Sequence, residues 1–280
     1  MERLTILQRV RRKYKSIKSS RYESRKKDFL DKLINANRVV VLGNQKTGST
    51  AIADLIAKRS GKTVALDIQE AIPKPTWQLE QRYGLAEFPD FLFEYASDFE
   101  KDIIKEPSLT FFYHDLIKNM PNAKFAYIIR DPFENIRSIL NRLKVPGNIE
   151  DIEVEDWPEF YYMPTWKLAI DSTWLGWPKG NYIEALAYRW CEAADVYLGH
   201  RSEMHLIKYE EFLSDKAEVI DNACRYLNLE PKNDISEFLD RQYQKKGNHG
   251  VDLIEFFGRD NYSRIEDICR DRARMFGYDL

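Results

Sequence analysis

A glycine-containing loop between an expected strand and an expected helix is the feature that most constrains how this chain folds. Residues 38–42 (RVVVL) are apolar and β-branched, which predicts a buried strand, and residues 49–59 carry apolar positions at helical spacing. A turn of this kind directs backbone N–H groups and the positive end of the helix dipole at one point. The sequence therefore predicts a site for phosphate or sulfate oxygens, with Ser49 and Thr50 as additional hydroxyl donors.

The position of the lysine distinguishes this loop from that of nucleoside triphosphatases. In their pattern, GxxxxGK[ST], the lysine directly follows the second glycine. Here Gly43 and Gly48 have the same spacing, but Ser49 follows Gly48 and the lysine lies inside the loop. The loop resembles the 5′-phosphosulfate loop of sulfotransferases, x-K-x-G-[ST]-T, and an ordinary strand-to-helix turn is the alternative. The matching residues are Gln45, Lys46, Thr47, Gly48, Ser49 and Thr50.

A second segment, AKFAYIIRDPFENIRSIL, resembles the 3′-phosphate-binding segment of the same family. It consists of a strand that ends at Arg130, then Asp131 and Pro132, then a helix that carries Ser138. An arginine at the carboxyl end of such a strand lies where open α/β sheets bind ligands and can bind a phosphate in bidentate fashion. We expect Arg130 and Ser138 to bind the 3′-phosphate, and a turn that merely caps a helix is the alternative.

Two later stretches extend the resemblance to about residues 38–280. HLIKYEEFLSDKAEVIDNACRYLNL is similar to the late strand, turn and helix of sulfotransferases, which implies that Tyr209 lies near the adenine. KKGNHG, with Lys245, Lys246 and Gly247, is similar to the basic-glycine loop that closes over the 3′-phosphate. The resemblance implies 3′-phosphoadenosine 5′-phosphosulfate as the sulfuryl donor and no requirement for a metal.

Sulfuryl transfer, like phosphoryl transfer, relies on positioning and on charge stabilisation. The resemblance assigns Lys46 to the leaving oxygen and Lys105 to the transferring group. The histidine that cytosolic sulfotransferases place just after this second lysine is missing, because Glu106 and Pro107 follow Lys105. Carbohydrate and tyrosyl-protein branches use a glutamate at the end of the second strand, which implies Glu70 as the base. Glu106 is the second candidate, with Asp67 and His114 as further alternatives.

The order of elements predicts an α/β fold. Expected strands at 38–42, 63–68, 102–105, 124–129 and 204–208 alternate with expected helices, including 111–119, 133–143 and 182–199. This rhythm predicts one domain with a central parallel sheet flanked by helices, and the resemblance makes it a P-loop-like sulfotransferase fold. We place this domain at 38–280, with an aromatic-rich insertion at about 145–182 and a basic arm or helix at 1–37.

Charge is distributed unevenly along the chain. The net charge is −2 and the pI is about 6.2, which argues against a general nucleic-acid binder. Residues 1–28, however, contain eleven Lys or Arg and three Asp or Glu. Leu4, Leu7 and Val10 fall near one face of this segment, a pattern compatible with docking on an anionic membrane, and a solvated tail is the alternative.

The remaining expectations concern compartment and acceptor. Three cysteines without paired spacing and the lack of a long apolar run indicate a cytoplasmic protein, in peripheral contact with a membrane if the arm docks there. The expected acceptor is a hydroxyl-bearing molecule such as a glycan or a lipid-linked glycan. The alternatives are a P-loop nucleotide kinase or NTPase and a non-catalytic, nucleotide-binding member of the fold.

Overall fold

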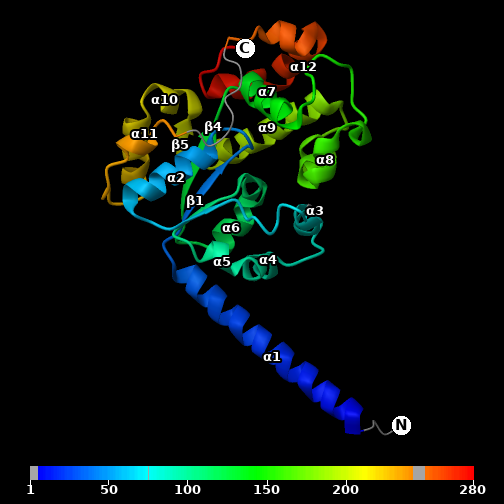
Figure 1. Cartoon of the computed structure of the whole chain (residues 1–280), viewed down its shortest axis with the longest axis vertical. Coiled ribbons are helices and arrows are strands. Elements are labelled where there is room, and N and C mark those ends of the chain that lie inside the picture. The colour runs from blue at the N-terminus through cyan, green and yellow to red at the C-terminus, as the bar shows by residue number, and fades with distance from the viewer. Residues whose placement is uncertain (1–5, 75, 242–249) are drawn as a thin grey trace.

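Five parallel strands form the central sheet (Figure 1). The computed structural model describes residues 6–74, 76–241 and 250–280, and the strand order within it is β2-β3-β1-β4-β5. Every pairing in the sheet is parallel, which confirms the expected α/β class. The strands are β1 (Val39–Gly43), β2 (Val64–Leu66), β3 (Ile103–Lys105), β4 (Lys124–Ile129) and β5 (Met204–Lys208).

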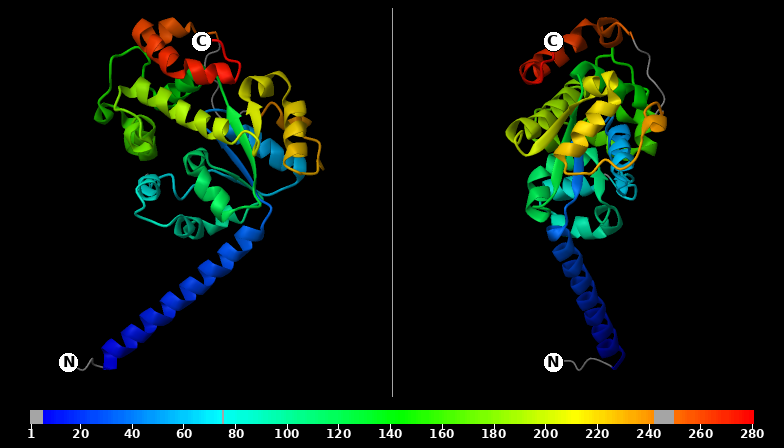
Figure 2. Two further views of the ribbon diagram at one scale, coloured as in Figure 1. Left: turned by 180° about the vertical axis from the view of Figure 1, so that it is seen from behind. Right: turned by 90° about the vertical axis from the view of Figure 1, so that its left-hand side faces the viewer.

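Both faces of the sheet are buried because successive side chains of each strand point to opposite sides. In β1, Val39 and Val41 belong to one apolar cluster, and Val40 and Leu42 belong to the other. Helices α2 (Ser49–Ser60) and α11 (Lys216–Tyr226) cover the first face. The second face is covered by α6 (Tyr113–Asn119), α7 (Pro132–Leu143), α9 (Tyr182–Gly199) and α12 (Leu253–Met275). The two layers are visible in the side view of Figure 2.

The remaining helices are short, apart from the first one. They connect the strands or follow the sheet at its edges. They are α1 (Ile6–Asn35), α3 (Thr76–Arg82), α4 (Phe88–Glu94), α5 (Ala96–Phe99), η1 (Pro107–Phe112), η2 (Val154–Asp156), α8 (Pro158–Tyr162), η3 (Pro164–Ala169), η4 (Thr173–Leu175), α10 (Tyr209–Ser214) and η5 (Ser236–Phe238).

The strand order changes direction between β1 and β4. The connection that leaves β1 runs to β2 at one edge of the sheet, and the connection that leaves β4 runs to β5 at the other edge. Ligands of open α/β sheets bind at such a switch point, beyond the carboxyl ends of the strands. The loop that follows β1 lies at this edge.

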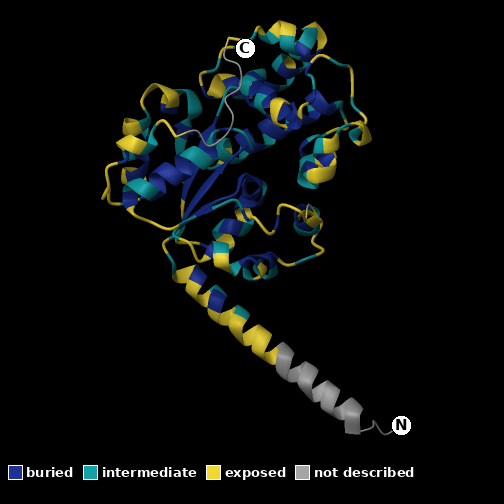
Figure 3. Cartoon of the chain, in the orientation of Figure 1, coloured by how far each residue is buried: buried dark blue, intermediate teal, exposed yellow. Residues whose placement is uncertain are grey.

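The aromatic-rich segment at 145–182 contributes to the core as well as to the surface. Its short helices bury Phe160 and Trp174 within the larger apolar cluster. Tyr161 and Tyr162 of α8 are instead among the most exposed aromatic residues of the described chain (Figure 3). The segment therefore consists of short helices and loops, and part of it fills the core.

Helix α1 projects away from the domain in Figures 1 and 2. Its last turns pack on the domain, where Phe29 and Leu33 are buried. Tyr22 contacts Phe93 of α4 edge-on at 5.1 Å, and Lys26 forms an ion pair with Asp90. Among the described residues, no helix combines the length and the apolar character needed to cross a bilayer.

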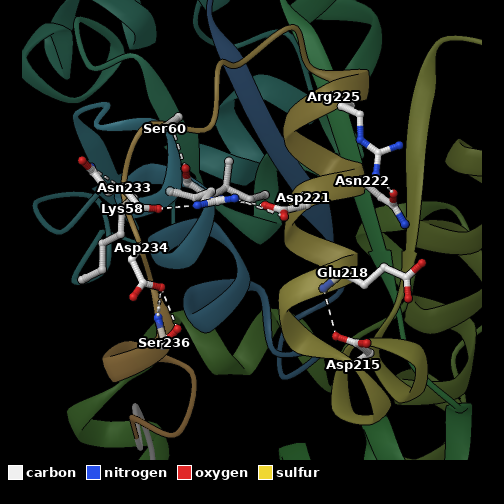
Figure 4. A network of polar contacts seen from close by, with 12 residues as sticks. Lys58, Ser60, Asp215, Glu218, Asp221, Asn222, Arg225, Asn233, Asp234 and Ser236 are labelled. Atoms are coloured by element: carbon white, nitrogen blue, oxygen red, sulfur yellow. Dashed lines mark hydrogen bonds and ion pairs between the residues drawn. The ribbon is translucent and has the colours of Figure 1, made fainter.

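A polar network at the end of α2 far from the β1–α2 loop fixes α11 beside it. Arg59 pairs with Asp221 of α11 at 2.6 Å and donates to the carbonyl oxygen of Asn233. The amide of Asn233 in turn donates to the carbonyl oxygen of Lys58 at 2.7 Å. Figure 4 shows these partners. The network holds the C-terminal end of α2, while the N-terminal end faces the loop.

Candidate active site

The β1–α2 loop has the backbone conformation of an anion-binding turn. Lys46 and Gly48 both have positive φ, 67° and 85°, and α2 begins at Ser49. Positive φ is costly for a lysine and indicates that the surrounding structure imposes the loop shape. The φ of Gly48 and the ring of Tyr209 both require glycine there, because a Cβ at this position would overlap the ring. Backbone N–H groups at the start of α2 therefore face one point beyond the sheet edge.

Side-chain amides hold the loop in place. Asn44 donates to the Asn135 side chain at 2.9 Å, and Asn135 donates back to the carbonyl oxygen of Gln45 at 2.7 Å. The hydroxyl of Thr47 is buried and donates to the carbonyl oxygen of Asn44 at 2.9 Å. Of the expected loop residues, Thr47 thus has a structural role for its side chain. Ser49 is buried and Thr50 is half-buried at the helix start.

Lys46 lies in a positive field. Burial, the largest cause, and the nearby charges of Arg142, Arg130 and Lys105 together lower the pKa of Lys46 to about 8. An ammonium group that is destabilised in this way gains the most when an anion binds beside it. The loop and its lysine therefore form a site that favours a negatively charged ligand.

Lys105, the second expected cation, ends β3 next to β1 and is buried. Its ammonium group lies 2.5 Å from Oδ1 of Asp67, the residue that follows β2. The backbone N–H of Asp67 also donates to the carbonyl oxygen of Lys105 at 2.8 Å. Asp67 has positive φ, 66°, so two of the four such non-glycine residues in the described chain, Lys46 and Asp67, lie at this site.

Glu106 is buried directly behind this ion pair. Its two carboxylate oxygens accept from the backbone N–H groups of Ser108 at 2.9 Å and of Ile68 at 3.3 Å. Burial raises the pKa of Glu106, and the charge of Asp67 adds to the rise, while Lys105 opposes it. Glu106 thus fixes the turn that carries Asp67 and also caps η1.

The other base candidates, Glu70 and His114, have other neighbours in the structure. Glu70 is exposed, and its charge acts on Asp98, whose pKa is raised first by burial and then by Glu70. His114 is exposed on α6, where its ring lies 5.2 Å from that of His200. Asp67 and Glu106 are the carboxylates that the structure brings to Lys105.

Arg130 follows β4 and faces the loop from the other side. Its Nη1 donates to the carbonyl oxygen of Lys46 at 3.4 Å, and its guanidinium carbon lies 4.7 Å from the ring centre of Tyr209. Its Nη2 pairs with Glu134 at 2.9 Å. Glu134 also pairs with Arg137 at 2.7 Å. Arg130, Tyr209 and Lys46 are therefore gathered at one edge, as the motifs predicted.

The other residues expected at the 3′-phosphate are placed in part. Ser138 is half-buried in α7, the helix that also carries Glu134 and Arg137. Lys246 and Gly247, together with Lys245, lie outside the described residues. Of the residues expected at the 3′-phosphate, the structure therefore describes Arg130 and Ser138 and not the basic-glycine loop.

Three further residues belong to the site but were not among the expected site residues. Asn135 lies inside the RDPFENIRS segment, so its position three residues after Pro132 was a usable signal. Arg142 lies at the end of the same helix and adds charge near Lys46. Arg189 of α9 contacts Gln45 across 144 positions of sequence, and nothing local in the sequence pointed to it.

Solved structures of similar architecture are sulfotransferases. Sulfotransferase STF9 from Mycobacterium avium matches with a TM-score of 0.55 and 15% identity over 92% of this chain and 82% of that chain. STF1 from Mycobacterium tuberculosis matches with 0.53 and 11%, over 89% and 80%. Mouse sulfotransferase SULT7A1 complexed with PAP matches with 0.51 and 14%, over 90% of each chain. No family model and no curated protein matches the sequence. The chain therefore has the sulfotransferase fold, as expected.

Proposed function

We propose that the chain is a sulfotransferase that moves the sulfuryl group of 3′-phosphoadenosine 5′-phosphosulfate to a hydroxyl group of an acceptor. The observation that carries this proposal is the position of Lys46 and Lys105 on adjacent strand ends, around a loop built for an anion. The fold of the chain and the PAP complex of one structural neighbour support it.

The residues present fit this donor. The loop N–H groups, Lys46 and the N-terminus of α2 would hold the 5′-phosphosulfate end. Arg130 would hold the 3′-phosphate, and Glu134, which now pairs with Arg130, would have to share that arginine or move away. Tyr209, which packs against both Gly48 and Arg130, would stand between the two ends of the donor.

The donor supplies a sulfuryl group whose transfer forms a bond from sulfur to the acceptor oxygen, breaks the bond to the 5′-phosphate oxygen and releases the hydroxyl proton. Lys46 donates a hydrogen bond or a proton to the departing phosphate oxygen, where negative charge develops. Lys105 stabilises the equatorial sulfuryl oxygens from the adjacent strand. Both cations are already in place, so they need little reorganisation during the transfer.

Asp67 is the residue that we propose as the base. It is the more exposed partner in its ion pair, with 29% of its side-chain surface accessible against 4% for Lys105. It accepts the acceptor proton at the carboxylate that already contacts Lys105. Glu106 acts as a positioning residue, because both of its oxygens accept backbone N–H groups of the turns on either side. Glu70, the base implied by the resemblance, lies farther along the turn beside Asp98.

The acceptor that we propose is a glycan or a lipid-linked glycan. The exposed rings of Tyr161 and Tyr162 offer flat apolar faces of the kind that stack on sugar rings. The segment that carries them contacts the turn after β2, since the hydroxyl of Thr165 donates to the carbonyl oxygen of Ile72. This hydrogen bond supports the proposal, because it joins the segment with the exposed rings to the stretch of chain that follows Asp67.

Ligand binding and product formation test the proposed function. We expect 3′-phosphoadenosine 5′-phosphate to raise the thermal midpoint without Mg²⁺, because it binds the folded state alone. We also expect a labelled sulfuryl donor to yield labelled product with at least one member of a panel of glycans, glycolipids and phenols. Stabilisation by ATP with Mg²⁺ and none by the bisphosphate would favour the kinase alternative. Bisphosphate binding with no product from any acceptor would favour the non-catalytic alternative.

A further inference from the structure

Arg189 in α9 is a buried cation without a carboxylate partner in the described part of the chain. Only 2% of its surface is exposed. Its Nε and Nη2 both donate to Oε1 of Gln45, at 2.9 and 2.8 Å. Its Nη1 is buried and has no hydrogen-bond partner among the described residues. The described hydrogen-bond acceptor of this charged group is thus a single neutral amide oxygen.

Burying a charge in this way is unfavourable for folding. Desolvation lowers the pKa of Arg189, and the charge of Glu106 opposes this effect only in part, so the pKa is about 9. Aromatic rings give some compensation, because the guanidinium carbon lies 4.4 Å from the ring centre of Phe111 and 5.8 Å from that of Trp174. The aromatic rings therefore contact the guanidinium, and Gln45 accepts hydrogen bonds from its Nε–Nη2 edge. Among the described residues, Nη1 has no hydrogen-bond partner.

A glutamate at position 45 would remove this cost. Gln45 is held in a fixed orientation, since its Nε2 donates to the hydroxyl of Ser108 at 3.2 Å and its Oε1 faces Arg189. Glutamate has nearly the same shape and would form a bidentate ion pair with the guanidinium. The chain instead has the neutral Gln45 directly before Lys46, so the charge of Arg189 is compensated only in part.

The position of Arg189 relative to the loop indicates whether it would bind an anion of the donor or of the acceptor. Arg189 lies over the ring of Phe111 in η1, and its partner Gln45 donates to the hydroxyl of Ser108 in the same helix. Glu106 caps that helix, so Arg189 lies on the side of the loop that carries Glu106. In an in-line transfer the acceptor approaches opposite the leaving phosphate, and the proposed base lies on that same side.

We propose that Arg189 recognises a negatively charged group of the acceptor, a carboxylate, sulfate or phosphate that lies near the hydroxyl to be modified. This inference rests on the proposed function, because that function defines the acceptor side. An anion at the Nη1 edge supplies both the missing hydrogen-bond partner and the missing counter-charge. A neutral acceptor leaves the buried charge unbalanced, so the site prefers acidic glycans or acidic phenols to neutral ones.

Binding to the full chain saturated with 3′-phosphoadenosine 5′-phosphate tests this preference. Two matched pairs serve as probes in calorimetry: methyl glucuronide with methyl glucoside, and hydroxybenzoate with hydroxybenzamide. In at least one pair we expect the carboxylate to bind about tenfold more tightly than its neutral partner, the ratio typical of one charged contact. In Gln45→Glu and Arg189→Gln this ratio should fall to about one, because the charge is neutralised or removed.

Arg272→Gln is the matched control. Arg272 also stacks on a tryptophan, Trp177 at 5.3 Å, but it pairs with Asp195 at 2.7 Å, so its charge is balanced. Its loss should leave the ratio unchanged. If Arg189→Gln does not fold, Gln45→Glu decides alone, and we expect that variant to have a higher thermal midpoint than the wild type.

Three outcomes overturn the inference: equal binding within both pairs, binding of none of the four probes, or a carboxylate preference that survives Gln45→Glu. The bisphosphate titration of the same samples separates this result from the proposed function. Bisphosphate binding without a carboxylate preference refutes the role of Arg189 alone. Failure of the wild type to bind the bisphosphate refutes the proposed donor.

Discussion

Tyr209 packs its ring against Gly48 so closely that no side chain fits at position 48. The two residues come from different motifs, one at the end of the β1–α2 loop and the other directly after β5, and the sheet brings them together. Because the guanidinium carbon of Arg130 also lies over this ring, 4.7 Å from its centre, Tyr209 links the two expected phosphate sites. The shape of the loop therefore depends on a contact across the sheet as well as on its own sequence.

Substitution of Gly48 should disrupt the loop more than its backbone angle alone predicts. We expect Gly48→Ala to lower the thermal midpoint and to abolish measurable bisphosphate binding, because strained φ and overlap with Tyr209 both oppose the native loop. Gly84→Ala is the control, since Gly84 has a φ of 65° but open space around its Cβ position. It should show only the backbone cost, on the order of 1 kcal/mol. Similar losses in the two variants would mean that the ring contact is unimportant.

The depressed pKa of Lys46 predicts a pH dependence of donor binding. In the free protein the pKa of Lys46 is lowered to about 8, so Lys46 loses its proton as the pH rises through about 8. A bound anion raises this pKa, because it stabilises the charged form. Bisphosphate affinity should therefore fall above that pH, and binding near pH 8 should take up protons from the buffer. Calorimetry in buffers of different ionisation enthalpy measures this uptake. Lys46→Arg should show no proton uptake, and uptake of equal size in that variant would assign the titration to another group.

Arg130 should discriminate between nucleotides with and without a 3′-phosphate. We expect Arg130→Ala to weaken 3′-phosphoadenosine 5′-phosphate by roughly 2 to 4 kcal/mol, the range for loss of a buried charged contact. Adenosine 5′-phosphate, which lacks the 3′-phosphate, should be affected far less. Equal weakening of both ligands in a titration would show that Arg130 acts on the loop through the carbonyl oxygen of Lys46.

The basic first helix should attract an anionic surface. Seven of the eleven basic residues in 1–28 precede position 20, and the described side chains that contact the domain include Tyr22 and Lys26. Each basic residue near an anionic bilayer contributes about 1 kcal/mol at low salt. We expect the full chain to co-sediment with phosphatidylserine-containing vesicles and a chain without residues 1–19 to remain in solution with the same thermal midpoint. Binding to neutral vesicles, or binding that is insensitive to salt, would contradict an electrostatic role.

The sequence predicted the regular elements closely because they depend on local patterns. The strand expected at 124–129 and the helix expected at 182–199 have the observed bounds. The prediction for the end of the second strand was less accurate. We expected this end at residue 68, but β2 ends at Leu66 and the chain turns at Asp67, which has positive φ. This difference decides which carboxylate faces Lys105, and side-chain patterning does not report it.

Long-range contacts were the other part that the sequence did not reveal. Arg189 and Gln45 lie 144 positions apart, and an arginine in a helix is most often on its surface. Their contact arises because α9 packs on the second face of the sheet with this residue directed at the loop. A buried, unbalanced charge is a property of the assembled fold, so no spacing rule predicts it.

The assignment of the base gives the last prediction. We expect Asp67→Asn to lower kcat by at least about 100-fold while donor affinity changes little, because proton acceptance matters in the transition state. Glu70→Gln is the matched control and should keep near-normal turnover, since Glu70 lies beside Asp98. Glu106→Gln should lower stability along with kcat, because its oxygens hold the turns at Ile68 and Ser108. An inactive but folded Glu70→Gln, with Asp67→Asn still active, would return the role to Glu70.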